Sequence, residues 1–249
     1  MGLEALKVKR QLVQAPTQAV LIDALYPERW VKTREARIAR EVILMVGFAG
    51  FVALCAQIII RLPFTIVPIT GQTFAVLVTG GALGMWRGAG ALSIYLLAGW
   101  AMPIYAPASA GKVVGTDVVH FIFPWNGTSA YVWDISSGGY IVGFVLAAFL
   151  AGYFAKKGWD RKPWNIGGLL AANVILYVPG LLWLAYLLST NWIHPSGKPL
   201  ADLIAGEGTL EKTLVGGLYP FILGDMIKLY LASLTLPAAW TLANRLRKG

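Results

Sequence analysis

Long apolar segments alternate with short polar ones along most of the chain. Six apolar segments can be delimited in the sequence, at about 42–60, 69–86, 88–105, 138–155, 166–188 and 214–243. Each comes close to the roughly 20 apolar residues that an α-helix needs to cross a hydrocarbon layer about 30 Å thick. The pattern therefore predicts an all-α membrane protein with six transmembrane helices joined by loops.

Residues 1–41 differ from the rest because charged side chains recur throughout them. We expect this part to be a cytoplasmic extension, followed by a membrane domain over residues 42–249. Within the extension, residues 17–30 predict either a short amphipathic helix on the membrane surface or a partly disordered tail. The extension does not resemble a cleavable signal, because the first long apolar run starts only at Val42.

Basic residues flank the apolar segments unevenly. If the N-terminus is cytoplasmic, the inner side collects Arg34, Arg37, Arg40, Arg87, Lys156, Lys157, Arg161, Lys162, Arg245, Arg247 and Lys248. The outer side receives only Arg61, Lys112, Lys198 and Lys212. This asymmetry follows the positive-inside rule and predicts that both termini are cytoplasmic, in a multi-pass protein of the cell membrane, such as a bacterial inner membrane.

The composition supports the same class. Hydrophobic residues make up 57% of the 249 residues and charged residues 13%, and the mean hydropathy is +0.64. A soluble domain could not cover itself with so little polar surface. The formal net charge of +9 comes mainly from the flanking clusters, so we do not expect a nucleic-acid partner. Cys55 is the only cysteine, which excludes a disulfide within the chain.

Two long connections, 106–137 and 189–213, are expected on the outer side. The first contains the aromatic residues Phe121, Phe123, Trp125, Tyr131 and Trp133. This density of aromatics predicts either packing over a pocket or anchoring at the membrane interface.

The sixth apolar segment carries the sequence Gly224-Asp225-Met226-Ile227-Lys228, which places a carboxylate and an amine on one helix face. Charges inside a membrane helix are costly, and they usually mark a substrate or ion pathway. A self-contained ion pair that locks helix packing is the alternative.

In the expected topology, polar or aromatic groups of other segments reach the depth of this pair. They are Gln72 in the second segment, Tyr140 in the fourth and Trp183 in the fifth. An apolar cavity with a few placed hydrogen-bonding groups is what a small-solute site requires. We therefore expect a pocket open to the outside.

Several catalytic and energising motifs are missing from the sequence. Ala110-Gly111-Lys112 lacks the first glycine and the Ser or Thr of a nucleotide-binding loop, so the chain is not expected to hydrolyse ATP. The two histidines, His120 and His194, stand isolated in loops, and no metal or cofactor site is indicated. We expect no enzyme, with an intramembrane hydrolase as the least favoured alternative.

One run joins the first two apolar segments. It extends from Ala56-Gln57 through Arg61-Leu62-Pro63-Phe64-Thr65 to Val67-Pro68-Ile69-Thr70-Gly71-Gln72-Thr73-Phe74-Ala75-Val76. This run resembles the BioY family, the biotin-binding S components of energy-coupling factor (ECF) transporters. The resemblance continues through Tyr95-Leu96-Leu97-Ala98-Gly99, Gly138-Gly139-Tyr140, Gly180 to Leu184, and the Gly224-Asp225 to Lys228 motif.

The resemblance implies a six-helix subunit that captures biotin outside the cell and works with a transmembrane coupling protein and two cytoplasmic ATPases. It implies a biotin site that contains Asp225 and Lys228, with Thr70, Gln72, Gly139, Tyr140 and Trp183 as further candidates. It also implies that small residues of the first helix, here Ala49 and Ala53, contact the coupling protein.

The chain departs from the family pattern on the expected outer side. The family usually has Gly-Pro-Thr where this chain has Ile135-Ser136-Ser137, and the loop 189–213 has no clear counterpart. A stand-alone biotin carrier that works without the ATPases remains the alternative mode of transport.

Overall fold

The computed structural model of the chain describes residues 20–27, 30–62, 65–107, 119–123, 125–162 and 164–246. The α-helices are α2 (Leu21–Leu25), α3 (Arg34–Ala56), α4 (Gln72–Leu83), α5 (Met85–Ala98), α6 (Gly138–Lys156), α7 (Asn165–Ser189), α8 (Gly208–Gly217) and α9 (Tyr219–Leu246). The 3-10 turns are η3 (Val132–Asp134), η4 (Trp159–Arg161) and η5 (Leu200–Asp202). Three two-residue strands, β1 (Ile59–Ile60), β2 (Ile69–Thr70) and β3 (Val119–His120), form an antiparallel sheet in the order β2-β1-β3.

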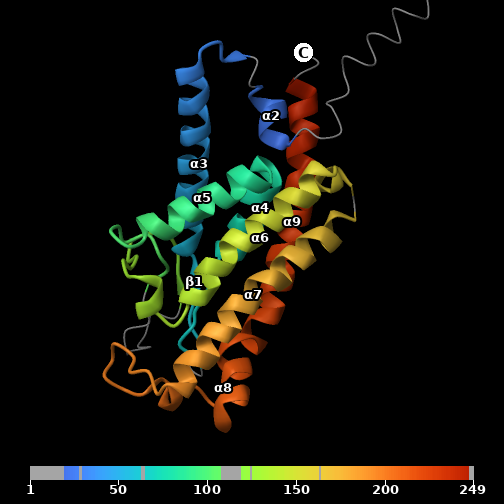
Figure 1. Ribbon diagram of the computed structural model, residues 1–249. Coiled ribbons are helices and arrows are strands. Elements are labelled where there is room, and N and C mark those ends of the chain that lie inside the picture. Colours follow the sequence, from blue (N-terminus) through green and yellow to red (C-terminus); the bar gives the residue numbers. More distant parts are fainter. Residues whose placement is uncertain are drawn as a thin grey trace, which may run out of the picture.

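Four helical stretches in the described part of the chain are long and apolar enough to cross a membrane. They are Arg34–Ala56, Gly138–Lys156, Asn165–Ser189 and the stretch Gly208–Leu246 formed by α8 and α9. Figure 1 shows them as a tilted bundle, in which the start of α3 and the end of α9 lie at the same end. The chain is therefore a multi-pass membrane protein, whereas six crossings and a cytoplasmic location of both termini remain predictions.

α4 and α5 are shorter than the apolar segments that predicted them. The segments covered residues 69–86 and 88–105, and at about 1.5 Å per residue the two helices are roughly 18 and 21 Å long. β2 occupies the start of the segment 69–86. Gly84, at a φ of 82°, ends α4, and the chain changes direction there before α5 begins at Met85. Neither helix alone reaches the thickness of about 30 Å that a perpendicular crossing requires.

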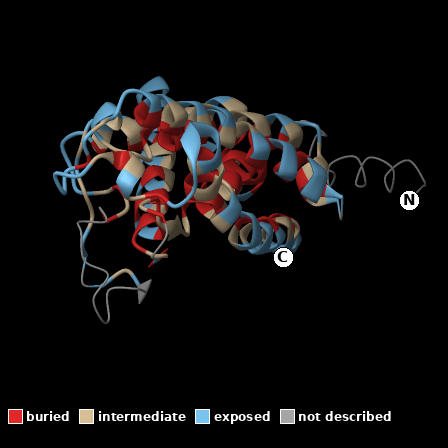
Figure 2. Ribbon diagram, turned by 90° about the horizontal axis from the view of Figure 1, so that it is seen from below, coloured by how far each residue is buried: buried red, intermediate tan, exposed pale blue. Residues whose placement is uncertain are grey.

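α6 lies at the centre of the bundle and packs against α4, α5 and α7. A Cβ atom at Gly80 of α4 would lie 2.4 Å from the carbonyl oxygen of Ala148, and one at Gly143 would lie 2.4 Å from that of Leu176. Only glycine allows the backbones to approach so closely. Figure 2 shows the buried residues along the middle of the bundle, where these helices meet.

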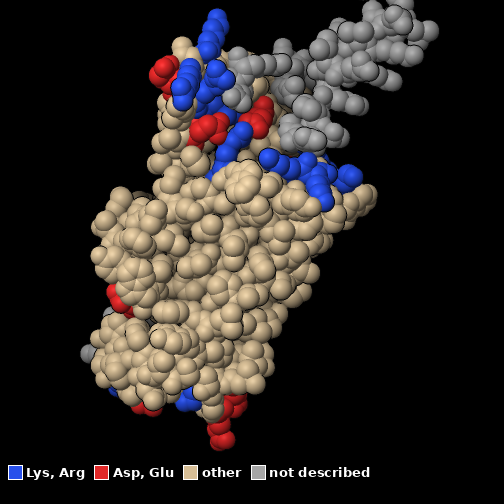
Figure 3. Space-filling view, viewed as in Figure 1, with Lys and Arg blue, Asp and Glu red and all other residues tan. Residues whose placement is uncertain are grey.

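Charged side chains gather at one end of the molecule. Figure 3 shows most of the basic and acidic residues at the end of the bundle that extends from the start of α3 to the connection between α6 and α7, then a broad and almost uncharged band, and a few charges at the far end near α8. Uncharged surface over the middle of a helical bundle is what contact with lipid requires.

α2 packs onto the membrane helices. Its buried residues Leu21 and Ala24 belong to an apolar cluster with residues of α4 and α9. Of the segment expected to be amphipathic, residues 20–27 and Trp30 are described, and the helix covers only Leu21–Leu25. The boundary that we expected between the extension and the membrane domain, at residues 41 and 42, falls inside α3. The charged first turns of α3 continue without a break into its apolar part.

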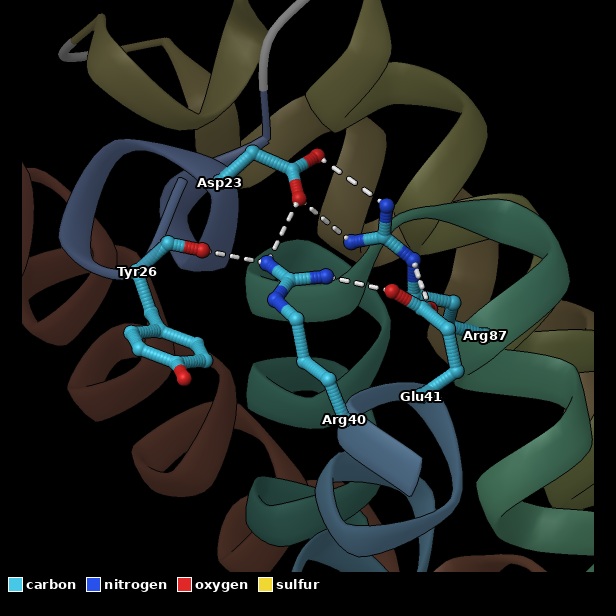
Figure 4. Close-up of polar contacts among 5 residues, drawn as sticks. All are labelled: Asp23, Tyr26, Arg40, Glu41 and Arg87. Atoms are coloured by element: carbon cyan, nitrogen blue, oxygen red, sulfur yellow. Dashed lines mark hydrogen bonds and ion pairs between the residues drawn. The ribbon is translucent and has the colours of Figure 1, made fainter. Parts of the chain in front are cut away.

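An ion-pair network holds α2 against the starts of α3 and α5 (Figure 4). The Arg40 guanidinium, in a residue only 4% exposed, donates to Asp23 Oδ1 over 3.1 Å, and it also bonds to the Tyr26 carbonyl and the Glu41 carboxylate. Arg87 Nη1 and Nη2 donate to the two oxygens of Asp23 over 2.8 and 3.2 Å, and Arg87 Nε lies 2.7 Å from Glu41 Oε2. Two arginines and two carboxylates thus balance in charge.

Replacing Asp23 with asparagine is expected to destabilise the protein. The change leaves Arg40 and Arg87 to share one carboxylate, Glu41, and Arg40 is too buried for water to compensate. We expect a loss of roughly 2 kcal/mol, the scale of a hydrogen bond to a charged group, seen as a lower unfolding temperature in detergent. Asp202→Asn is the matched control, because Asp202 is exposed and has no ion pair among the described residues. Equal unfolding temperatures for the two variants would contradict a stabilising role of the network.

Candidate ligand-binding site

A cavity lies between the starts of α4, α6 and α9 and the middle of α7. Figure 1 shows that these parts of the helices lie in one half of the bundle, and Figure 3 shows that most charges lie at the opposite end. The cavity encloses about 960 Å³ of space that no atom fills, including the part open to solvent. The apolar part of the lining includes Ile66, Phe144, Leu176 and Phe221.

An acidic and a basic side chain of α9 lie together in the cavity. Asp225 is 3% exposed, forms an ion pair with Lys228, and accepts a hydrogen bond of 2.6 Å from the Tyr177 hydroxyl of α7. The spacing of three residues places both charges on the cavity side of α9. The Lys228 ammonium also donates to the Thr70 carbonyl oxygen over 3.0 Å and lies 3.4 Å from Thr73 Oγ1. The pair thus links α9 to α7, β2 and α4.

Gln72, at the first position of α4, is held by hydrogen bonds at both ends of its amide. Its Oε1 accepts from Thr70 Oγ1 over 2.9 Å, and its Nε2 donates to the Tyr95 hydroxyl over 2.7 Å. Tyr140 of α6 donates its hydroxyl to the Gly217 carbonyl over 2.7 Å, and its ring meets that of Tyr177 edge to face. These polar groups are fixed in place by the protein itself.

Five of the seven predicted binding residues line this cavity: Thr70, Gln72, Tyr140, Asp225 and Lys228. The other two, Gly139 and Trp183, do not line the cavity. A Cβ atom at Gly139 would lie 2.3 Å from the Pro179 carbonyl oxygen, so Gly139 serves the close contact of α6 with α7. Trp183 donates its Nε1–H to the Ile135 carbonyl over 3.0 Å and thereby holds the segment that precedes α6.

The two alanines expected to contact a coupling protein are buried within the chain. Ala49 and Ala53 are each 5% exposed and pack into the apolar core. On the other side of α3, Gly47 and Gly50 have no atom within 4 Å of an added Cβ. The small residues on the open face of α3 are therefore Gly47 and Gly50. The sequence showed small residues at helical spacing, but it did not show which face the bundle covers.

The aromatic residues of the first long connection lie at the surface. Phe121 is 64% and Phe123 79% exposed, and the rings of Tyr131 and Trp133 stack on each other at 4.8 Å between centroids. Neither these four nor Trp125 lines the cavity. Their position favours anchoring at the membrane interface over packing on a pocket.

Several residues that line the cavity were not singled out from the sequence. Tyr177 supplies the hydroxyl that bonds to Asp225, Thr73 contacts Lys228, and Trp192 and His194 reach the cavity from the connection between α7 and η5. A hydroxyl within an apolar helix was a usable signal for Tyr177. No local sequence pattern could have predicted that His194 lines the cavity, because its position depends on how the connection after α7 folds back.

Comparison with known proteins identifies the family. The sequence model of the BioY family matches residues 28–245. The chain belongs to the BioY family. Among its BioY relatives, a biotin transporter from Rhizobium etli is 30% identical over 205 residues, which cover 78% of this chain and 90% of the relative. A probable biotin transporter from Pyrococcus horikoshii is 28% identical over 191 residues, covering 76% and 90% of the two chains.

The fold of this BioY chain also matches a solved structure, that of the S component for biotin from an ECF-type ABC transporter. The TM-score is 0.57 at 22% sequence identity, with 88% of this chain and 95% of the other covered. The match confirms the expected S-component-like fold. The BioY relatives are named as transporters, which supports the expectation that this chain is not an enzyme.

Proposed function

We propose that this BioY chain captures biotin from outside the cell in the cavity described above and serves as the substrate-binding subunit of an ECF-type transporter. The observation that carries the proposal is the convergence of five predicted residues on one cavity, with the Asp225–Lys228 pair among them. Membership in a family of biotin transporters supports the choice of ligand.

The chemistry of the cavity suits biotin. The cyclic urea of biotin has two N–H donors and one carbonyl acceptor, which match a carboxylate acceptor such as Asp225 and a donor such as Lys228 or the Gln72 amide. The fused rings are compact and largely apolar, and Phe144, Leu176 and Phe221 offer apolar surface to them. Thr70 and Tyr140 complete the polar part of the proposed site.

The partners of the proposed subunit are a transmembrane coupling protein and cytoplasmic ATPases, because this chain shows no nucleotide-binding loop of its own. We place the contact with the coupling protein on α3. The exposed face with Gly47 and Gly50 allows a partner helix to approach closely, whereas Ala49 and Ala53 become available only if α3 turns. Lipid covers the remaining apolar surface.

Uptake by the purified protein in liposomes tests the mode of transport. We expect steady accumulation of radiolabelled biotin only when the coupling protein and ATPases are reconstituted with the chain. ATP must then be supplied on the side of the liposome membrane where the ATPases lie. Accumulation by the chain alone would support the stand-alone carrier instead. Binding of biotin without uptake in either preparation would contradict transport while leaving the binding site in place.

A further inference from the structure

The charged pair deep in the cavity has few hydrogen-bond donors to spare. Lys228 forms an ion pair with Asp225, donates to the Thr70 carbonyl oxygen and lies 3.4 Å from Thr73 Oγ1, and the Tyr177 hydroxyl donates to Asp225. The negative charge of Asp225 balances the positive charge of Lys228. A ligand that carries a carboxylate as well as a polar head group therefore needs donors elsewhere in the cavity.

His194 offers such a donor at the outer mouth, which is the edge of the cavity beside the connection between α7 and η5, on the side that the predicted topology places outside the cell. The residue is 8% exposed and borders the cavity, on the connection between α7 and η5. The backbone N–H of Ser196 donates to His194 Nδ1 over 3.1 Å, so Nδ1 is an acceptor and the ring proton sits on Nε2. Burial lowers the pKa of His194, which keeps this neutral form dominant at pH 7.

The orientation of the His194 ring is fixed by its own loop. The His194 backbone N–H donates to the Lys198 carbonyl over 2.9 Å, the Gly197 N–H donates to the His194 carbonyl over 2.8 Å, and Ser196 Oγ lies 2.9 Å from Nδ1. The Nε2–H, by contrast, has no partner among the described residues. An oriented and unpartnered donor at the edge of a cavity can bond to an acceptor of a ligand.

Ser136 and Ser137 border the same cavity from the residues just before α6. Their hydroxyls also lack a partner in the described part of the chain, and the N-terminus of a helix carries a partial positive charge that favours anions. Asp134 is on the rim as well, but it is exposed to solvent. Ser136, Ser137 and the His194 loop are among the places where this chain departs from the family pattern.

We infer that His194 Nε2–H, together with the Ser136 and Ser137 hydroxyls, binds the carboxylate of a monocarboxylic ligand at the outer mouth, while the polar head group of the ligand lies against Asp225 and Lys228. The inference rests on the proposed function and adds the residues that recognise the acidic end of biotin. It assigns a specificity-determining role to a loop that the family pattern does not contain.

The test compares biotin with biotinamide, whose neutral amide replaces the carboxylate. Both are titrated calorimetrically into wild type, His194→Ala and His194→Gln. We expect His194→Ala to weaken biotin binding at least about 10-fold, the low end of the effect of one hydrogen bond to a charged group, and to leave biotinamide binding within about 2-fold. His194→Gln should recover part of the loss, because its amide retains an N–H donor.

Biotinamide binding also shows that each variant is folded. Equal weakening of both ligands by His194→Ala would mean that His194 only holds its loop, and unchanged biotin binding would mean that the carboxylate lies elsewhere. Either result overturns the inference while the proposed function stands. If wild type binds neither ligand, the proposed function fails, and the inference fails with it.

Discussion

Asp225→Asn is expected to weaken biotin binding by roughly 30-fold, which corresponds to about 2 kcal/mol for a hydrogen bond to a charged group. The substitution keeps the shape of the side chain and an acceptor for the Tyr177 hydroxyl. It removes the negative charge that faces Lys228, whose side chain is 13% exposed. An unpaired buried ammonium should also cost about 3 kcal/mol of stability. Calorimetric titration and thermal unfolding measure the two effects separately.

The double variant Asp225→Asn, Lys228→Met separates binding from folding. Removing both charges abolishes the uncompensated ammonium, so we expect its unfolding temperature to return toward that of wild type. Biotin binding should remain weak, because the urea has lost its charged acceptor. Wild-type affinity in the double variant would show that the pair is only a packing device, the alternative that the sequence left open.

Gly143→Leu is expected to cost at least about 3 kcal/mol of stability, the upper end of the usual effect of overpacking. The first added carbon would lie 2.4 Å from the Leu176 carbonyl oxygen, and a backbone atom in the middle of α7 cannot move aside alone. α6 and α7 would have to separate. We expect little folded protein after detergent extraction, measured by size-exclusion chromatography and thermal unfolding.

Gly47→Leu is the matched control for this substitution. Gly47 is also in the middle of a long helix, α3, but a Cβ atom there would have no neighbour within 4 Å. The same change of residue should therefore leave the yield of folded protein close to that of wild type. Similar losses for both variants would mean that glycine is needed for a reason other than the α6–α7 contact.

Two of the long apolar helices, α6 and α7, could be predicted from the sequence to within one residue. α6 was expected over 138–155 and covers Gly138–Lys156, and α7 was expected over 166–188 and covers Asn165–Ser189. Basic and polar residues bound these apolar runs sharply. α3, expected over 42–60, covers Arg34–Ala56, and the segment expected over 214–243 is divided into α8 and α9. α4 and α5 were predicted less well, because hydropathy cannot register that Gly84 adopts a positive φ or that residues 69–70 pair as a strand.

The deep part of the candidate site was predictable because its signal is local. Asp225 and Lys228 are charges within an apolar helix, and any membrane helix must direct such charges away from lipid. The burial of Ala49 and the approach of His194 to the cavity were not predictable, because both depend on which distant segments pack together. The sequence thus indicated the charged pair and missed the residues that the loop after α7 brings to the edge of the cavity.

The most direct test of the account is calorimetric titration of biotin into the purified wild-type protein in detergent. We expect saturable binding of one biotin per chain, which is weakened in Asp225→Asn. No binding at concentrations up to about 1 mM, where even a weak complex would form, would contradict the assignment of this cavity to biotin.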